Sequence, residues 1–340
     1  MSFLIHGRGL AAALTVDALL TEGIAPSQIW VEGELSPPAG SLAPAALLNP
    51  LTGRSLKPPV EGPSVFASSQ ETWKRLEKVY PNLIHSKTVF RPFLSGHKLF
   101  EKLHKTFNKY IDELQSGWGV RPATDTELEV LRRATGPETL GAMTIESCFA
   151  VELEAFLASF WKTLTHSGLN CGNHAPTGST VIRCDGAALK LTLSPTTELQ
   201  SLGGELFEIA PLRELPIDYA LAGDGHYIPL DAQRAVIGST YHRHGQTLES
   251  PPWEHLQRRL RSWLPLVDAS PQRTWYGERL IAPDDRKPII GSLPKQDSTF
   301  VCTGFASKGL YWGPYATQAL VKHILHQTPL PNPISIARFL

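Results

Sequence analysis

The amino-acid sequence predicts an α/β protein in which one domain is wound around a parallel sheet and a second, α+β domain is built on an antiparallel sheet. Three observations predict this class. A strand, a glycine turn, a helix and a second strand follow one another within the first 32 residues. Amphipathic helical stretches fill the middle of the chain from Ser68 onward. Three strand-like runs with short connections then follow between residues 205 and 241.

The composition is that of a globular protein with a large core. The chain has 340 residues, 42% hydrophobic and 19% charged, and its 13 Phe, 8 Tyr and 8 Trp exclude a disordered chain. At about 100–200 residues per domain, this length corresponds to roughly two domains. The 32 basic and 32 acidic residues cancel, which argues against a strong general affinity for nucleic acid or anionic membranes. No stretch reaches the ~20 apolar residues of a membrane span, so we expect no membrane association.

The four cysteines predict neither a disulfide framework nor a metal site. Cys148, Cys171, Cys184 and Cys302 are widely spaced and form no CxxC pair. Cys171 and His174 resemble half of a metal site, but the sequence offers no second half with ligand spacing. We therefore expect buried or half-buried thiols in the reducing cytoplasm and no bound metal.

The first strand and helix enclose a glycine-rich turn. Gly7-x-Gly9-x-x-Ala12 follows an apolar run and opens a helix, and Glu32 ends a second strand. This order is the fingerprint of a Rossmann-like dinucleotide-binding unit. Gly7 permits a tight turn, Gly9 lets a pyrophosphate approach the backbone, and Ala12 allows close packing of helix on strand. The first N–H groups of the helix would face the phosphates, and Glu32 would accept hydrogen bonds from ribose hydroxyls.

The segment after the second strand, residues 37–54, is rich in proline and small residues and low in charge. A solvated linker would contain more Lys, Glu and Ser, so we expect a loop that packs tightly over a ligand. Gly40, Ala46, Leu47 and Asn49 in this segment are candidate ligand contacts.

Amphipathic helices and a short-connected sheet account for the middle of the chain. Apolar residues recur at three- and four-residue intervals over residues 73–80, 99–114, 149–164 and 253–264. We expect these stripes to form core rather than cofactor contacts. The runs at residues 205–209, 226–230 and 235–241 are expected to pair in an antiparallel sheet, because their connections are short.

Two glycine-containing runs lie near the C-terminus. The first contains Gly277-Glu278-Arg279, Asp285 and Pro288-Ile289-Ile290-Gly291, and the second reads Thr303-Gly304-Phe305-Ala306-Ser307-Lys308-Gly309-Leu310 before a helix that Pro314 opens. With the N-terminal fingerprint and the Cys184-Asp185-Gly186 turn, these runs agree in order over nearly the whole chain with one family. The chain resembles the D-amino acid oxidase superfamily of FAD-dependent oxidoreductases, which includes glycine and sarcosine oxidases.

Some segments are closest to one member of this superfamily. The loop at residues 49–53 and the segment from Gly309 to Pro314 are similar to the oxidase half of the bifunctional tRNA wobble-uridine modification enzyme, whose methyltransferase half this chain lacks. The chain departs from the family pattern at Ala12, in place of a third glycine, and at Arg8, where the family usually has a small residue. No cysteine lies beside Arg279 for covalent attachment of flavin, so the resemblance implies noncovalent FAD.

The resemblance implies that each domain is assembled from separate segments. We expect a FAD-binding domain from residues 1–65, 135–205 and 265–340, and a substrate domain from residues 66–134 and 206–264. The N-terminal and C-terminal motifs must then meet in space although they lie at opposite ends of the chain. The antiparallel sheet of the substrate domain would lie over the flavin.

The resemblance also implies an oxidation chemistry. A small amine or amino-acid substrate loses a hydride from its α-carbon to FAD, the resulting imine hydrolyses, and molecular oxygen reoxidises the flavin. Arg279 corresponds to the arginine that holds the substrate carboxylate, and its guanidinium can pair with both oxygens. The turn from Gly304 to Gly309 would direct N–H groups at the pyrimidine end of the flavin, where Lys308 would add a cation. The implied FAD contacts are Gly7, Gly9, Leu10, Ala12, Glu32, Gly40, Ala46, Leu47, Asn49, Gly304, Phe305, Ala306, Ser307, Lys308, Gly309 and Leu310.

Two other functions stay open from the sequence. The first is oxidative deglycination of a carboxymethylaminomethyl uridine in tRNA, whose secondary glycine would also suit Arg279. Basic patches for tRNA would come from Lys98, Lys102, Lys105 and Lys109 and from Arg258, Arg259 and Arg261, but the neutral total charge makes tRNA the less favoured partner. The second is a non-catalytic flavoprotein that serves in assembly. Loss of Arg279 would favour that function, and Arg279 is present.

Overall fold

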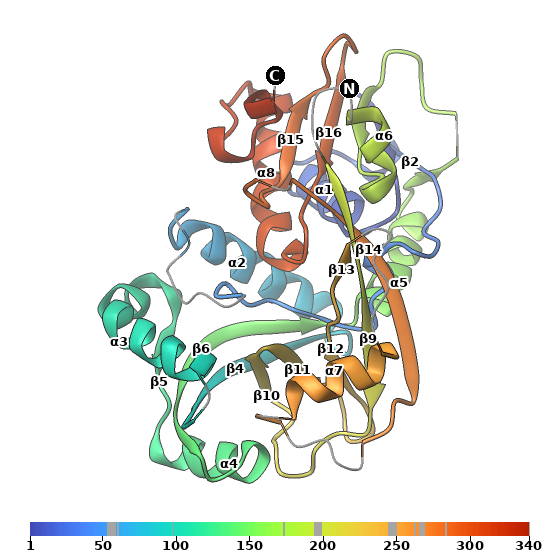
Figure 1. The fold of residues 1–340 in the computed structure, drawn as a ribbon. Coiled ribbons are helices and arrows are strands. Elements are labelled where there is room, and N and C mark those ends of the chain that lie inside the picture. Colours follow the sequence, from blue (N-terminus) through green and yellow to red (C-terminus); the bar gives the residue numbers. More distant parts are fainter. Residues whose placement is uncertain are drawn as a thin grey trace.

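The computed structural model describes residues 1–52, 59, 61–96, 98–172, 174–193, 199–243, 250–261, 263–264, 269–282 and 284–339. Gly53 and Arg54, at the end of the predicted ligand loop, lie outside the described residues. The strands form two sheets, one of six and one of ten strands. The long strands β9 (Gln200–Ile209) and β14 (Arg273–Ile281) belong to the larger sheet and reach toward the smaller one (Figure 1).

The six-stranded sheet has the order β15-β16-β8-β1-β2-β7. Every neighbouring pair is parallel except β15 with β16, and Phe3 at the start of β1 lies between Ile29 and Thr180. The predicted sequence of strand, turn, helix and strand in the first 32 residues is therefore confirmed. The strands are β1 (Phe3–His6), β2 (Ile29–Glu32), β7 (Asn170–Cys171), β8 (Thr180–Arg183), β15 (Ile289–Ser292) and β16 (Thr299–Thr303).

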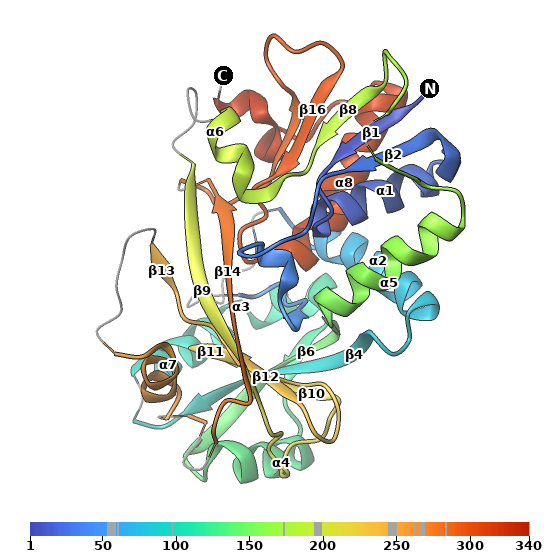
Figure 2. The same ribbon diagram turned by 90° about the vertical axis from the view of Figure 1, so that its right-hand side faces the viewer.

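Three helices pack beside this sheet, as Figure 2 shows: α1 (Leu10–Thr21), α5 (Leu153–His166) and α8 (Gly309–His326). Helix α1 lies against both α5 and α8, so most of its residues are buried. Gly313 in α8 makes this approach close, because a Cβ there would lie 2.4 Å from Cδ1 of Leu14. The two ends of the chain are thus packed against each other.

The ten-stranded sheet has the order β13-β9-β12-β11-β10-β4-β6-β3, with β14 paired to β9 and β5 paired to β6. Its pairs are antiparallel, as predicted, except for β4 with β10, which is parallel. Its other strands are β3 (Ala46–Leu47), β4 (Ile84–Leu94), β5 (Val120–Pro122), β6 (Thr139–Val151), β10 (Tyr219–Gly223), β11 (Gly225–Pro229), β12 (Ala235–Gly238) and β13 (His242–Arg243).

The helices of the middle region surround the larger sheet. They are α2 (Ser64–Val79), α3 (Lys98–Trp118), α4 (Asp125–Thr135) and α7 (Pro252–Leu260), and a short α6 (Leu189–Leu193) precedes β9. Helix α3 buries Phe100, Leu103, Phe107 and Leu114, which share one face at three- and four-residue spacing, and it packs on β4 and β5. Gly117 ends its regular turns with a φ of 85°.

The predicted aromatic stripes form core. Trp73 of α2 and Phe156 of α5 are fully buried, with ring centroids 5.8 Å apart, and Tyr80 meets Phe156 at 5.3 Å. One connected apolar cluster includes residues of both sheets. The apolar spacing of the sequence therefore identified buried faces correctly.

Sheet membership differs from the predicted division into domains. Strands β6 and β14 and the first half of β9 lie in segments predicted for the FAD-binding domain, yet all three pair in the ten-stranded sheet. The reason is continuity of pairing: β14 pairs with β9 along its whole length, from Arg273 to Ile281. The boundaries of the two domains stay a prediction.

Candidate active site

The glycine turn after β1 is built by the ends of three neighbouring strands. The Gly7 N–H donates to the Glu32 carbonyl at 2.9 Å, and the Cys184 N–H donates to the His6 carbonyl at 2.8 Å. Gly7 has a φ of 109°, and a Cβ at this position would lie 2.7 Å from the carbonyl oxygen of Cys184. Only glycine fits there, as the fingerprint predicts.

The start of α1 offers hydrogen-bond donors at this turn. Gly9 precedes the helix without a side-chain cap, and the Leu10 N–H donates to the Ser41 hydroxyl at 3.0 Å. The N–H groups of Ala11 and Ala12 have no acceptor in the described part of the chain. Ala12 is fully buried, which agrees with its predicted role in packing the helix on the strand.

Two charged side chains beside the turn keep polar atoms without a partner. Nε of Arg8 and Oδ1 of Asp185 are both buried, and neither has a hydrogen-bond partner among the described residues. Oδ2 of Asp185 pairs with the Arg183 guanidinium. A buried donor and a buried acceptor next to free helix N–H groups fit a ligand that carries both phosphate oxygens and hydroxyl groups, as FAD does.

Glu32 ends β2 at the edge of this turn, as predicted. Its carboxylate forms an ion pair with Nδ1 of His6, the last residue of β1. The pair holds the carboxylate at the carboxyl end of the parallel strands, where nucleotide ligands bind in such sheets. The contact with His6 was not predicted.

The C-terminal turn meets the N-terminal turn. Gly304, with a φ of 74°, and Ala306, with a φ of 53°, reverse the chain after β16, and α8 begins at Gly309. A Cβ at Gly309 would lie 2.8 Å from Cδ2 of Leu10. The expected meeting of the two terminal motifs is therefore confirmed. Helix α2 holds α8 in place, because Nε1 of Trp73 donates to the Leu310 carbonyl at 2.8 Å.

The proline-rich segment packs against β14. The Glu278 N–H donates to the Pro38 carbonyl at 2.7 Å, and a Cβ at Gly40 would lie 3.2 Å from Cγ of Arg279. The segment is thus a packed loop, as expected, and it lies beside the strand that bears the predicted substrate arginine. Ala46 and Leu47 pair with β6, and Asn49 accepts the N–H of Leu51 at 2.9 Å within its own loop.

Arg279 lies flat on one face of the ten-stranded sheet. Gly204 and Gly277 are paired directly across β9 and β14, and a Cβ at Gly204 would lie 2.9 Å from Nη2 of Arg279. A Cβ at Gly277 would lie 2.1 Å from the ring of Trp275. The two glycines therefore leave room for a guanidinium and an indole ring side by side on this face.

Tyr241 joins Arg279 to the C-terminal turn. The guanidinium carbon of Arg279 lies 5.0 Å from the centroid of the Tyr241 ring, and the hydroxyl groups of Ser239 and Ser307 also lie near the Tyr241 side chain. Tyr241 is half exposed, and partial desolvation alone would raise its pKa. The Arg279 charge and the nearby hydroxyl groups outweigh this desolvation and lower the pKa of Tyr241 below its usual value of 10. Sequence reasoning missed Tyr241, since nothing in its local pattern relates it to Arg279.

Lys308 lies among charged groups at the other side of the turn. Burial lowers the pKa of Lys308, and the positive charges of Arg286 and Lys287 lower it further. The negative charge of Glu61 opposes this decrease in the pKa. Nζ of Lys308 lies 5.9 Å from the ring of Tyr311, and Lys287 pairs with Glu61 at 2.7 Å. Lys308 is therefore a partly buried cation next to the predicted flavin-binding turn.

The described residues contain no group of three or more His, Cys, Asp or Glu side chains that could hold a metal ion. All four cysteines are free; three are buried, as expected, whereas Cys171 is exposed because it ends the edge strand β7. Within the described ranges, no helix has the length and apolar character needed to cross a membrane.

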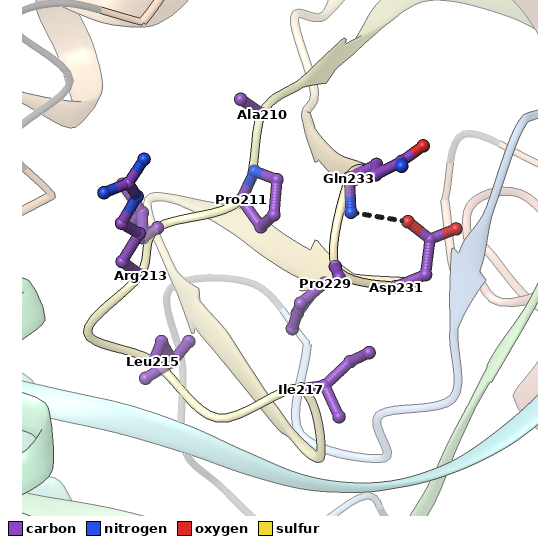
Figure 3. Close-up of a pocket in the computed structure, with 10 residues that line it drawn as sticks. Ala210, Pro211, Arg213, Leu215, Ile217, Pro229, Asp231 and Gln233 are labelled. Atoms are coloured by element: carbon purple, nitrogen blue, oxygen red, sulfur yellow. Dashed lines mark hydrogen bonds between the residues drawn. The ribbon is translucent and has the colours of Figure 1, made fainter.

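A surface groove of about 650 Å³ lies elsewhere on the molecule (Figure 3). It is lined by the loop after β9, residues 210–217, and by Pro229 and residues 231–233. This loop begins after Ile209, the last residue of β9, whereas Gly204 lies in the middle of that strand. None of the residues that line it is a predicted site residue, so the groove is separate from the candidate active site.

Comparisons with known proteins agree with this geometry. The chain matches the family model described as DAO, FAD dependent oxidoreductase, over residues 31–322. Three solved structures are similar over almost their whole length. Glycine oxidase from Geobacillus kaustophilus has a TM-score of 0.78 and 18% identity, covering 100% of this chain and 99% of that one. Iminodiacetate oxidase (IdaA) from Chelativorans sp. BNC1 has a TM-score of 0.77 and 17% identity, covering 99% and 98%. L-amino acid deaminase from Proteus vulgaris has a TM-score of 0.78 and 12% identity, covering 99% and 97%.

One relative is detected by sequence. The tRNA 5-methylaminomethyl-2-thiouridine biosynthesis bifunctional protein MnmC of Burkholderia vietnamiensis is 26% identical over 189 residues, which are 46% of this chain and 29% of that protein. The match thus spans less than a third of the relative's length. The solved structures, at their low identities, show the shared fold. The family match extends over most of the chain and includes both β14 and the C-terminal turn, and we conclude that the chain belongs to the DAO family of FAD-dependent oxidoreductases.

Proposed function

We propose that this protein oxidises the carbon–nitrogen bond of an amino acid or an N-substituted glycine, with molecular oxygen as the final electron acceptor. The observation that carries the proposal is the contact of Arg279 with Tyr241, which in turn reaches Ser307 of the C-terminal turn. A cation suited to a carboxylate thus lies beside the segment expected to face the flavin. When bound, FAD accepts the hydride from the substrate's α-carbon.

Arg279 binds the substrate carboxylate in this proposal. Its planar guanidinium pairs with both carboxylate oxygens, and the Tyr241 ring, 5.0 Å away, limits the orientations of the guanidinium. The carboxylate then fixes the position of the α-carbon against the C-terminal turn. The glycines at 40, 204 and 277 keep the guanidinium close to the sheet, because any side chain there would collide with it or with Trp275.

The residues expected to hold FAD are the two terminal turns. Arg8 and the first N–H groups of α1 would face the pyrophosphate, and Glu32 the ribose. Ser307, Lys308 and the start of α8 would face the pyrimidine end of the ring system, where a positive dipole end and a cation stabilise negative charge. No cysteine lies on β14 beside Arg279, which supports noncovalent binding.

The experiment is an anaerobic substrate screen with the purified, FAD-loaded protein. Glycine, sarcosine and other N-substituted glycines, and D- and L-amino acids, are mixed with it while the flavin absorbance is recorded. We expect at least one carboxylated amine to bleach the flavin, and admission of oxygen to restore the colour and form hydrogen peroxide. A protein that binds no FAD, or a flavin that only amines without a carboxylate can bleach, contradicts the proposal.

A second candidate is oxidative deglycination of carboxymethylaminomethyl uridine in tRNA. Lys98, Lys102, Lys105 and Lys109 form one exposed stripe on α3, and no ion pair of theirs exists among the described residues. Such a stripe suits a phosphate backbone. The candidate predicts that modified tRNA bleaches the flavin at far lower concentration than the free N-substituted glycine does. It also predicts that replacing these four lysines by glutamate removes this advantage without affecting the small substrate.

A further inference from the structure

His226 on β11 is a half-buried histidine that faces the candidate active site. It pairs directly with Gly238 of β12, Gly238 pairs with Leu206 of β9, and Leu206 pairs with Trp275 of β14. Directly paired residues share a face of the sheet, and side chains along one strand alternate between faces. His226 and Trp275 therefore lie on the face that also carries Arg279.

Small residues flank His226 on the two neighbouring strands. Its partners on the two neighbouring strands are Ala222 and Gly238, which have almost no side chain. A Cβ at Gly238 would lie 3.5 Å from Cε1 of His226 and 2.2 Å from Cδ2 of Leu206, so the imidazole reaches over Gly238 toward β9 and meets the Leu206 side chain there. None of the hydrogen bonds of the described residues involves this ring, although it has one donor and one acceptor.

The charged groups around His226 are Arg279 on its own face and Arg259, which lies near Gly225 on the opposite face. Arg279 of β14 and Arg259 of α7 both act on it, and Arg259 is held by the Asp224 and Ser239 carbonyls at 3.0 and 2.6 Å. The Asp224 carboxylate lies 3.9 Å from Arg259. Tyr241 lies on the same face, stacked on Arg279.

The acidic groups nearest in the strands belong to the opposite face. Glu205 contacts His242 at 2.7 Å and accepts a hydrogen bond from the Thr240 hydroxyl, so both partners of its carboxylate lie on that face. Burial, followed by the charges of Arg279 and Arg259, lowers the pKa of His226 to about 4. The imidazole is thus neutral at neutral pH, and it lies near the guanidinium that the proposed function assigns to a carboxylate.

We propose that His226 is a second binding partner of the substrate carboxylate held by Arg279, and that its imidazole takes up one proton from solvent as that carboxylate binds. The inference rests on the proposed function. A carboxylate placed between the guanidinium and the imidazole offsets the positive charge that keeps the ring neutral, and it provides an acceptor for a second N–H. Binding and protonation then favour each other reciprocally. Affinity for carboxylates should therefore rise as the pH falls from about 6.5 toward about 4, and should be constant above that window.

The experiment measures binding of methoxyacetate, a carboxylate without an amine, to the FAD-loaded protein by the change in flavin absorbance. We expect the wild-type protein to bind it roughly three- to tenfold more tightly at about pH 5.5 than at about pH 7.5. Calorimetry in two buffers of different ionisation enthalpy should show proton uptake at the lower pH. In His226→Gln and His226→Asn the affinity should no longer depend on pH and the uptake should vanish. His326→Gln, which changes an exposed histidine of α8, should behave like the wild type.

The outcomes separate this inference from the proposed function. If both His226 variants keep the pH dependence and the proton uptake while their FAD spectrum is native, the inference is wrong and the role of Arg279 stands. If the wild-type protein binds methoxyacetate with the same affinity as Arg279→Ala, then Arg279 holds no carboxylate. That result overturns the proposed function and this inference together.

Discussion

At the scale of single residues, Arg279 decides the substrate class. Its guanidinium lies on Tyr241 and above the backbone of Gly204, positions that a flexible surface arginine would not keep. We predict that Arg279→Ala and Arg279→Lys bind FAD normally, but that flavin reduction by carboxylated amines slows by roughly thirty-fold to several thousand-fold, since a charge-assisted pair contributes about 2–5 kcal/mol. Lysine should restore little, because one ammonium cannot reproduce the two parallel hydrogen bonds. Stopped-flow reduction measures this, with an amine that lacks a carboxylate as the control. Wild-type rates in both variants for every carboxylated amine would make Arg279 structural.

At the scale of elements, α4 shows how a helix in this protein begins. The Thr124 hydroxyl accepts the Glu127 N–H at 3.3 Å, the Glu127 carboxylate accepts the Thr124 N–H at 2.8 Å, and Arg121 pairs with the same carboxylate at 2.8 Å. Arg121, followed by these hydrogen bonds, outweighs burial and lowers the pKa of Glu127 to about 2. Because the unfolded chain binds this proton more readily, the contribution to stability is complete above about pH 4.5 and is lost as the pH falls toward about 2. We predict that Glu127→Gln lowers the free energy of unfolding by about 1–2 kcal/mol at pH 7. The deficit should shrink over that acid range in urea titrations, while the exposed Glu129→Gln should show no such pH-dependent loss.

At the scale of the whole molecule, the two ends of the chain share one interface. Gly309 and Leu10 are in contact, and a Cβ at Gly9 would lie 2.9 Å from the Ser41 hydroxyl that receives the Leu10 N–H. A cofactor bound at both turns would stabilise this arrangement by mass action, by about 2.7 kcal/mol when free FAD is 100 times its dissociation constant. We predict that added FAD raises the unfolding temperature of the wild type, and that Gly9→Val, which blocks close approach to the backbone, removes this increase. Thr21→Val, at the other end of α1, serves as the control in thermal scans. A Gly9→Val protein that FAD stabilises as strongly as the wild type would place the cofactor elsewhere.

Local pattern was sufficient for the features that depend on neighbours in the chain. The Gly7-x-Gly9 pattern predicted a tight turn before a helix, and Gly7 has the positive φ that such a turn needs. The three- and four-residue spacing of apolar residues predicted the buried stripes around Trp73 and Phe156. The motif around Arg279 identified the correct family, whereas the strand β14 that carries Arg279 was not predicted.

Only the tertiary structure decided which side chains surround Arg279. Between the pair Gly238–Leu206 and the pair His242–Gly203, residues 239–241 of one strand face residues 204–205 of the other, so the ladder contains one extra residue. Because of this bulge, the Tyr241 side chain points toward Arg279, whereas the side chains of Thr240 and His242 contact the Glu205 carboxylate. A change of one residue in register exchanges the two faces of a strand. The sequence alone therefore determined the glycine turns, the amphipathic helices and the arginine, whereas the pairing of distant strands determined the tyrosine and the histidine beside it.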